Sequence, residues 1–260
     1  MKFFVNFINK KMENNLQLIG EIFWFFIDYL KCLTSRPFYW GRLYQQIIEL
    51  GIGSLSITLV IGFVTGLVMT LQFGYGLTKF GGVLYVPAIV SLSLLRELAP
   101  IFTSLLIAGR IGSGISAEIG AMNVTQQIDA VRALGTSPVR VLVVPRVTAA
   151  IISLPLLGVL SGFMGIIGGG IIAYTEFNMP PGFYINKVLS TIRFIDVFGG
   201  YFKCMFFAVV ITILACYRGF NTKEGTRGVG NASTWVVVRS SIVILVSDFF
   251  LSKILILLFD

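Results

Sequence analysis

Five long apolar stretches dominate this sequence and limit what the chain can fold into. Each is long enough to cross a hydrocarbon layer of about 30 Å as a single helix. Across the chain 56% of the residues are hydrophobic and 12% are charged, whereas globular domains carry about 25% charged residues. We therefore predict an all-α polytopic membrane protein with transmembrane helices at about residues 47–71, 83–109, 147–173, 197–217 and 234–257.

Residues 16–33 are also apolar, but polar side chains interrupt them. The polar positions share one face of a helix: Gln17, Glu21, Asp28 and Lys31. This pattern is typical of an amphipathic helix in the membrane interface, and a sixth span is the alternative. We expect Ser35-Arg36-Pro37 to end the helix. Residues 1–42 then form an N-terminal interfacial segment and tail, and residues 43–260 form the membrane domain.

Basic residues gather beside the apolar stretches, and the net charge is +8. With the N-terminus inside, thirteen Lys and Arg residues fall in inner segments: Lys2, Lys10, Lys11, Lys31, Arg36, Arg42, Arg110, Arg132, Arg140, Arg146, Arg218, Lys223 and Arg227. Three fall in outer loops: Lys79, Lys187 and Arg193. Inner loops of membrane proteins carry such an excess. We therefore predict an N-in, C-out orientation and no nucleic-acid partner.

The sequence lacks the residue types and motifs of common catalytic sites. It contains no His, and Cys32, Cys204 and Cys216 lack metal-site spacing. The phosphate-binding pattern G-x-x-x-x-G-K-[ST] is absent too. The first residues do not form the short apolar core and cleavage site of a signal peptide. We predict a protein that is not an enzyme and has no catalytic residue, metal site or cofactor.

The charged pair Arg96-Glu97 lies within the second apolar stretch. A charge at the centre of a membrane helix costs about 2.5–3.5 kcal/mol on insertion scales. Such residues normally face a cavity or a partner, so the pair is a candidate for contacting transported material. The alternatives are an ion pair that only fixes helix packing, and a broken span that brings the pair near an interface.

Residues 123–135 have the pattern of a short amphipathic helix within the polar segment 110–146. Asn123 is a candidate N-cap with Gln126 three residues later, and Gly135 is a candidate C-terminal stop. The apolar residues fall on one face: Val124, Ile128, Val131 and Leu134. Such a helix is too short to span a membrane but can dock into a partner's groove. Packing under its own bundle is the alternative.

Glycines four residues apart occur in two of the predicted spans. The first span has Gly62 and Gly66, and the third has pairs at 158–162 and 165–169. G-x-x-x-G permits the close approach of membrane helices. We interpret the glycines as packing positions, with bending during transport as the alternative.

Three segments occur in a distinctive order. They are RELAP…AGRIGSGISAEIGAM within residues 66–122, then VTQQIDAVRALGTSPVRVLVVPR, then ACYRGFNTKEGTRGVGNASTWVVV. Together they resemble the MlaE-type permeases of lipid-transporting ABC systems, over about residues 40–256. The first segment is the most specific. The resemblance implies a permease dimer that binds two copies of an ABC ATPase subunit, usually with an MCE-domain substrate-binding protein.

The resemblance also implies a cargo of phospholipid or a related lipid, held in a cavity between the two permeases. Arg96 and Glu97 match the charged pair near that cavity, and Leu71 and Tyr75 are further candidates for lining it. Residues 123–135 match the family's coupling helix. Its candidate contacts with the ATPase are Val124, Gln126, Gln127, Ile128, Asp129, Val131 and Arg132.

Two departures and two alternatives accompany this resemblance. Gln126 stands where the family commonly has Glu, and Arg132 where an acid is frequent, so we expect compensating charges on the partner. The chain is rich in Phe and Ile, as plastid-encoded algal members are. We therefore expect the plastid inner envelope membrane, with a bacterial inner membrane as the alternative. An ion-coupled secondary transporter and a non-transporting membrane scaffold are the alternative functions.

Overall fold

The computed structural model describes the backbone of residues 2–34, 39–223 and 225–259, and the side chains from residue 16 to 258 within those ranges. It is 92% helical. The helices in chain order are α1 (Lys2–Leu33), α2 (Trp40–Ile47), η1 (Ile48–Ile52), α3 (Gly53–Thr78), η2 (Val83–Tyr85), α4 (Val86–Ser93), η3 (Leu94–Leu98), α5 (Ala99–Ile107), η4 (Ala108–Gly112), α6 (Ser113–Val124), α7 (Gln127–Ala133), η5 (Val139–Val143), α8 (Val144–Phe177), α9 (Pro181–Thr191), α10 (Phe194–Phe220) and α11 (Gly225–Phe259). The short segment η2 is a 3-10 helix, and the other η segments are π-helical.

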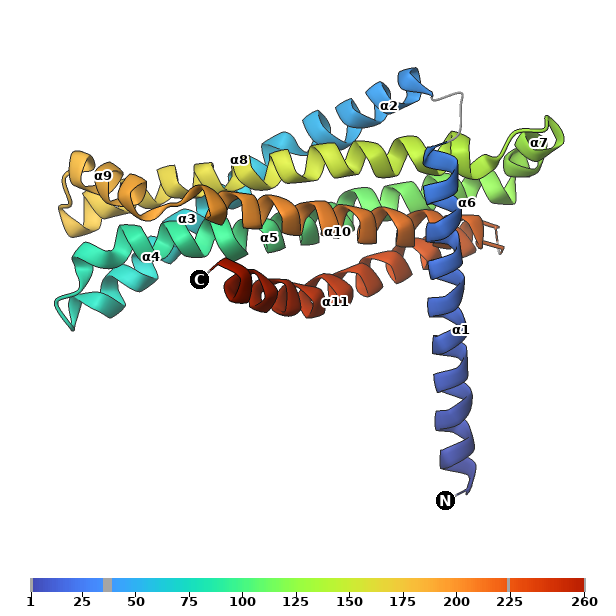
Figure 1. Ribbon diagram of the computed structural model, residues 1–260, viewed down its shortest axis with the longest axis horizontal. Helices are drawn as coiled ribbons and strands as arrows, with labels where there is room; N and C mark the ends of the chain where they lie inside the picture. The colour runs from blue at the N-terminus through green and yellow to red at the C-terminus, as the bar shows by residue number, and fades with distance from the viewer. Residues whose placement is uncertain (1, 35–38, 224, 260) are drawn as a thin grey trace.

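Five continuous helical runs form a bundle. Within the described ranges, five helices are long and apolar enough to cross a membrane: Trp40–Thr78, Val83–Val124, Val139–Phe177, Phe194–Phe220 and Gly225–Leu258. They lie side by side, with α7 at one end of the bundle and α9 at the other (Figure 1). This confirms the predicted all-α polytopic membrane fold. We refer to the two ends as the α7 end and the α9 end.

The helices extend beyond the predicted spans. The expected loop at 72–82 is wrong, because α3 continues to Thr78 and the turn occupies only residues 79–82. The polar segment 110–146 is helical as far as Val124. Between the predicted third and fourth spans, at 174–196, the chain forms the further helix α9. Apolar composition marks only the lipid-buried part of a helix, whereas backbone hydrogen bonding continues the helix into the polar region.

Helix α1 covers the amphipathic segment predicted at 16–33 and begins earlier, at Lys2. It crosses the bundle near the α7 end, where it contacts η5, α8 and α10 (Figure 1). Tyr29 is buried against the bundle, and this burial raises the pKa of its phenol. The described part of α1 is not among the helices apolar enough to span. Its interfacial position remains a prediction, and the expected break at 35–37 lies outside the described residues.

Glycines allow α3 and α8 to pack closely. A Cβ atom on Gly66 would lie 1.8 Å from the carbonyl oxygen of Gly165, and one on Gly62 would lie 2.3 Å from that of Ser161. No side chain fits at such distances, so the backbones touch directly. The packing interpretation of these glycines is confirmed.

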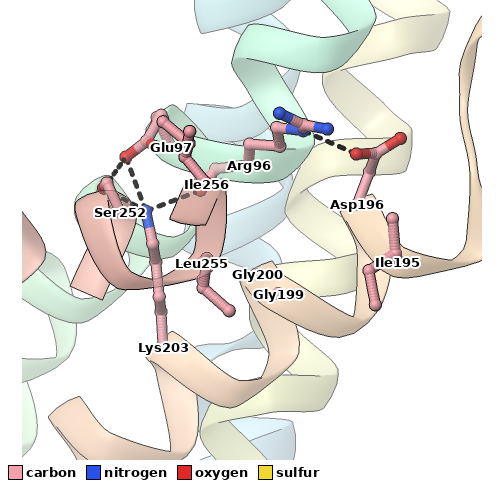
Figure 2. A pocket seen from close by; sticks show the side chains of 10 residues that line it. All are labelled: Arg96, Glu97, Ile195, Asp196, Gly199, Gly200, Lys203, Ser252, Leu255 and Ile256. Carbon is pink, nitrogen blue, oxygen red and sulfur yellow. Dashed lines mark hydrogen bonds and ion pairs between the residues drawn. The ribbon is translucent and has the colours of Figure 1, made fainter. Parts of the chain in front are cut away.

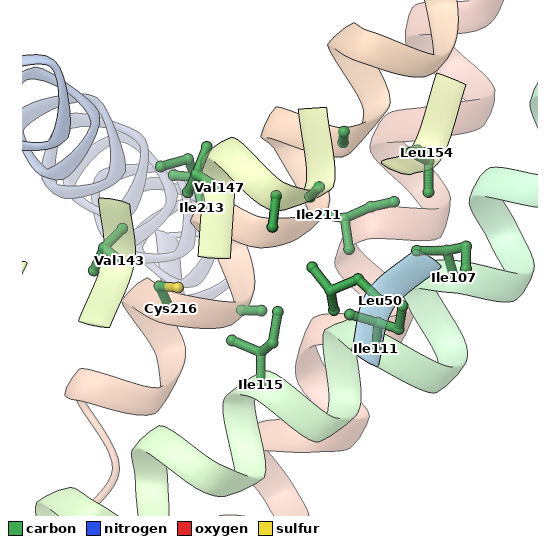
Figure 3. Packing of buried hydrophobic residues seen from close by; sticks show 14 of the residues in the cluster. Leu50, Ile107, Ile111, Ile115, Val143, Val147, Leu154, Ile211, Ile213 and Cys216 are labelled. Carbon is green, nitrogen blue, oxygen red and sulfur yellow. The ribbon is translucent and has the colours of Figure 1, made fainter. Parts of the chain in front are cut away.

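Branched side chains fill the bundle in the half nearer α7 (Figure 3). Ile111 and Ile115 from the second span meet Val147 of α8 and Ile211 of α10 in one buried cluster. Cys216 belongs to the same cluster and is a free thiol. This core positions the spans so that the polar groups described next come together in the other half.

Candidate functional site

Lys203, within α10, is the centre of a buried polar network (Figure 2). Its side chain is 1% exposed. The ammonium nitrogen Nζ lies 2.6 Å from Glu97 Oε2 and 3.2 Å from Asp248 Oδ1. It also donates hydrogen bonds to Ser252 Oγ at 2.7 Å and to the carbonyl oxygen of Arg96 at 3.0 Å. One cation therefore joins the second, fourth and fifth spans.

A second ion pair lies next to the first. Arg96 Nε donates to Asp196 Oδ1 at 2.5 Å. The Asp196 side chain is 1% exposed, and its other oxygen accepts the backbone N–H of Arg193 at 2.7 Å. Charges inside a membrane domain normally pair in this way, because an unpaired charge in lipid is costly.

The backbone geometry of η3 lets its two charged residues reach Asp196 and Lys203 on α10. Arg96 and Glu97 lie in the π-helical segment η3, and such bulges occur frequently at functional sites. A Cβ atom on Gly200 would lie 2.3 Å from the carbonyl oxygen of Leu95. Glycine at this position therefore lets α10 approach η3, so that the neighbouring charged side chains reach two separate positions on α10.

The network lies inside the apolar part of the bundle. Lys203 follows Phe194, the first residue of its span, by nine positions, and Asp248 precedes Leu258 by ten. At 1.5 Å per residue, both lie about 15 Å of helix from the α9 end. Two different spans therefore place the charges at a similar depth, in the half of the bundle remote from α7.

A small pocket of about 50 Å³ opens beside the charges. Its lining residues are Arg96, Glu97, Ile195, Asp196, Gly199, Gly200, Lys203, Ser252, Leu255 and Ile256. The Arg96 and Glu97 side chains are 33% and 37% exposed, so their charged ends are partly accessible. Sites for drug-sized ligands measure about 300–1,000 Å³, so one protomer offers only a fraction of the space that a whole lipid needs.

The other two candidates for the lipid cavity lie elsewhere in this protomer. Leu71 and Tyr75 are on α3 and do not line the pocket beside Glu97. Tyr75 is exposed, and its hydroxyl shares a hydrogen bond of 3.3 Å with Glu176. Their role in a cavity remains a prediction.

The predicted coupling segment contains a turn followed by a separate helix. The expected start at Asn123 is wrong, because α6 continues through this residue to Val124. Gln126, with a left-handed φ of 59°, separates α6 from α7. The Asn123 amide bonds the carbonyl oxygen of Thr222 at 2.9 Å instead of capping a helix. The stop predicted at Gly135 is confirmed by its φ of 72°.

The face of α7 that meets the bundle is narrower than predicted. Ile128 is fully buried and Val131 half-buried. Leu134 is 82% exposed, because the turn before α7 changes the helical phase and Leu134 already lies beyond its last residue. Val124 belongs to α6 and is exposed. The remaining candidates are exposed: Gln126, Gln127, Asp129 and Arg132.

Sequence reasoning missed three charged members of the network. Lys203 and Asp248 each interrupt an apolar stretch, as Arg96-Glu97 does. The rule that a charge within a span marks a functional position would have selected both. Asp196 precedes the expected fourth span by one residue, so no comparable signal identified it.

Comparison with known proteins identifies the family. Residues 43–254 match the family model of the permease MlaE. This chain belongs to the MlaE permease family. It is 36% identical over 214 residues to the intermembrane phospholipid transport system permease protein MlaE of Haemophilus influenzae, with 82% of each chain covered.

Two further relatives are probable ABC transporter permease proteins. The chain is 41% identical over 208 residues to one from Synechocystis sp., covering 80% of this chain and 79% of the relative. It is 33% identical over 212 residues to the protein ycf63 of Pyropia yezoensis, covering 82% and 81%. As an MlaE permease, the chain is a membrane-spanning subunit of the ABC transporter type.

Proposed function

We propose that this MlaE permease moves phospholipid or a related lipid, driven by a separate ABC ATPase subunit. The observation that carries the proposal is the buried ion network of Lys203, Glu97 and Asp248 beside a pocket within the apolar bundle. A lipid crossing such a bundle needs polar contacts for its headgroup and apolar contacts for its chains. The relative from Haemophilus influenzae is a phospholipid transport permease by name, which supports the same cargo class.

A second copy of the chain completes the lipid cavity in this proposal. The pocket of about 50 Å³ in one protomer is too small for a lipid. The span Gly225–Leu258 supplies Asp248 and Ser252, yet only 11% of its most apolar window is buried within the protomer. Its open face is therefore available to lipid and to a second copy. Two permeases facing one another enlarge the space beside both networks.

In this proposal the ATPase subunit acts on the permease through the α7 end. Ile128 anchors α7 to the bundle, while Gln127, Asp129 and Arg132 point outward. A short helix that is anchored on one side and polar on the other suits docking into a groove of a partner. We assign that groove to the ATPase subunit, present in two copies, one for each permease.

The cargo assignment is tested by Glu97→Gln in the complex purified from its own membrane. Charged hydrogen bonds contribute about 1.5–3 kcal/mol, so we expect transfer of labelled phospholipid in proteoliposomes to fall at least about tenfold. Phospholipid retained by the complex, counted by native mass spectrometry, should fall as well. Glu49→Gln is the matched control, because Glu49 is exposed and outside the network. Unchanged lipid retention and transfer in Glu97→Gln would refute the cargo site.

The coupling assignment is tested by Asp129→Lys. Asp129 pairs with Arg132 at 3.0 Å, and both side chains are about 60% exposed, so the pair contributes only about 0.2–1 kcal/mol to stability. We expect normal insertion and thermal stability but loss of ATP-driven lipid transfer. Lys79→Glu reverses an exposed charge at the other end of the bundle and should keep transfer intact. Normal transfer in Asp129→Lys would remove α7 from the coupling path.

An MCE-domain protein and the plastid inner envelope complete the proposal. The plastid location is supported by the similarity to ycf63 of Pyropia yezoensis and by the abundance of Phe and Ile. Fractionation of the source cells should place the chain in the envelope together with the ATPase. Complexes that contain no ATPase and still move lipid would favour an ion-coupled transporter. Complexes that hold no lipid would favour a scaffold.

A further inference from the structure

An apolar groove lies near the α7 end of the bundle, apart from the polar network. It is enclosed by α1, α10 and α11 and measures about 390 Å³, within the range of sites for drug-sized ligands. Every residue that lines it is hydrophobic. Ile22 and Phe26 come from α1, Phe206 and Val210 from α10, and Val243 from α11.

The groove exists because α1 contacts the bundle beyond it. The hydroxyl of Tyr217 donates to Glu21 on α1. The Phe25 ring meets the rings of Tyr217 and Phe220, with centroids 6.0 and 5.8 Å apart. These α10 residues are nearer the α7 end than the groove-lining residues 206–214. These contacts hold α1 against the part of α10 nearer the α7 end. The space between α1 and residues 206–214 is left open, and this space is the groove.

Two arginines follow the groove at its α7 end. Arg218 is one helical turn beyond Leu214 on α10, and Arg239 is one turn from Val243 on α11. Both lie toward the α7 end, because the two helices run in opposite directions. Their guanidinium carbons lie 5.4 and 5.2 Å from the centroid of the same ring, that of Trp235. The groove therefore ends in two cations and one indole.

Within the described part of the chain, positive charge is in excess around these two arginines. Among the residues that the structure describes, neither Arg218 nor Arg239 forms an ion pair with a carboxylate, and Arg218 Nε is buried with no hydrogen-bond acceptor. Glu21 accepts the hydroxyl of Tyr217, and its single negative charge leaves the two guanidinium groups with one positive charge in excess. Two guanidinium groups on one ring repel each other, and an anion placed between them removes that repulsion. Tryptophan is enriched at the level of lipid headgroups.

We propose that one anionic glycerolipid of the leaflet at the α7 end occupies this site. Its acyl chain fills the groove under α1, and its negatively charged headgroup binds between Arg218 and Arg239. Lys203 and Arg218 are 15 positions apart on α10, about 22 Å of helix, so this site is separate from the cargo pocket. The bound lipid fastens α1 to α10 and α11. The inference does not depend on which molecule the permease transports.

The two arginines set the expected selectivity. A basic residue near a membrane surface contributes about 1 kcal/mol toward anionic lipid. Two such residues predict a preference of about 30-fold for an anionic over a zwitterionic lipid, since about 1.4 kcal/mol corresponds to a factor of ten. Loss of one arginine should reduce the preference about fivefold.

The headgroup contact is tested on the full complex in detergent, after delipidation. Phosphatidylglycerol and phosphatidylcholine are added separately, and bound lipid is counted by native mass spectrometry. We expect the preference for phosphatidylglycerol to fall in Arg239→Gln and to persist in Lys223→Gln, which removes an exposed charge at the same end. Equal retention of both lipids, or an undiminished preference in Arg239→Gln, would overturn the proposal. So would inorganic phosphate alone, if it raised the melting temperature as much as phosphatidylglycerol.

The groove is tested by filling it. Val210→Trp should abolish retention of phosphatidylglycerol without changing the subunit composition of the complex. Val64→Trp, on the exposed side of α3, is the control and should retain the lipid. If Val210→Trp instead separated two copies of the chain, the groove would be a protein interface. If it bound phosphatidylglycerol normally, the acyl chain would have to lie elsewhere. Either result would refute the site.

Discussion

Replacing Lys203 by methionine should destabilise the permease more than any change of an exposed charge. Lys203 Nζ contacts Glu97 at 2.6 Å and Asp248 at 3.2 Å, and its side chain is 1% exposed. Asp248 Oδ1 has no hydrogen-bond partner among the described residues. Its ion pair with Lys203 is therefore the main interaction that offsets the cost of burying its charge. Methionine retains much of the apolar stem and removes the charge. The variant therefore leaves two carboxylates together without a cation.

The magnitude follows from the burial of the pair. Removing one partner of a buried ion pair costs about 3–5 kcal/mol, because the other charge remains buried and uncompensated. For a chain of this size, 1 kcal/mol shifts the melting temperature by about 2–4 °C. We therefore expect Lys203→Met to lower the melting temperature of the purified complex by about 6–20 °C. By comparison, an exposed ion pair contributes about 0.2–1 kcal/mol.

A compensated variant separates stability from transport. Lys203→Met combined with Glu97→Gln and Asp248→Asn removes all three charges and leaves near-isosteric polar groups. Because neutral replacement of a buried ion pair is often tolerated, we expect the melting temperature to recover. Lipid transfer in proteoliposomes should not recover, since the charged groups that we propose contact the cargo are gone. A melting temperature for the single variant within about 2 °C of wild type would refute this electrostatic account.

Two further predictions concern packing and orientation. Gly66→Ala should strongly destabilise the complex, because its Cβ would lie 1.8 Å from the carbonyl oxygen of Gly165, whereas Gly76→Ala meets no atom within 4 Å and should be neutral. Equal melting temperatures would contradict the α3–α8 contact. Cysteines introduced at Lys223 and Lys79, in a background without native cysteines, should react with impermeant reagents from opposite sides of the membrane. Labelling of both from one side would contradict the bundle topology.

The number of membrane-spanning helices could be predicted because each span has to be apolar along most of its length. The positions of the helix ends could not. The run Val83–Val124 continues past Arg110, where the apolar stretch stops, because a helix satisfies its own backbone whether lipid or water surrounds it. The helix α9 was missed because its sequence is short and opens with Pro180-Pro181-Gly182, which favours a turn.

The sequence could predict the two charged residues of the second span in the candidate site, but not their partners on other spans. Arg96 and Glu97 stand out because they are adjacent charges within an apolar stretch. Their partners on α10 and α11 are single charges far away in the chain, and only the packing of the spans brings them together. The turn at Gln126 was also hidden. Asn123 has the composition of an N-cap, but its amide bonds a neighbouring loop at Thr222, a tertiary contact that local sequence does not encode.

One helical run leads from the network toward α7, which follows it after a turn. From Glu97 to Val124, the last residue of α6, the chain advances 27 residues, about 40 Å of helix. Two π-helical segments, η3 and η4, lie within this run. Near η3 the run is fixed to α10 by two ion pairs, at Asp196 and Lys203, two turns apart. Sliding α10 by one turn would break both at once. In the proposed mechanism, movement transmitted from α7 along this run has to preserve these pairs or exchange them for others. Because Glu97 belongs to one of the pairs, an exchange would also change the proposed contact with cargo.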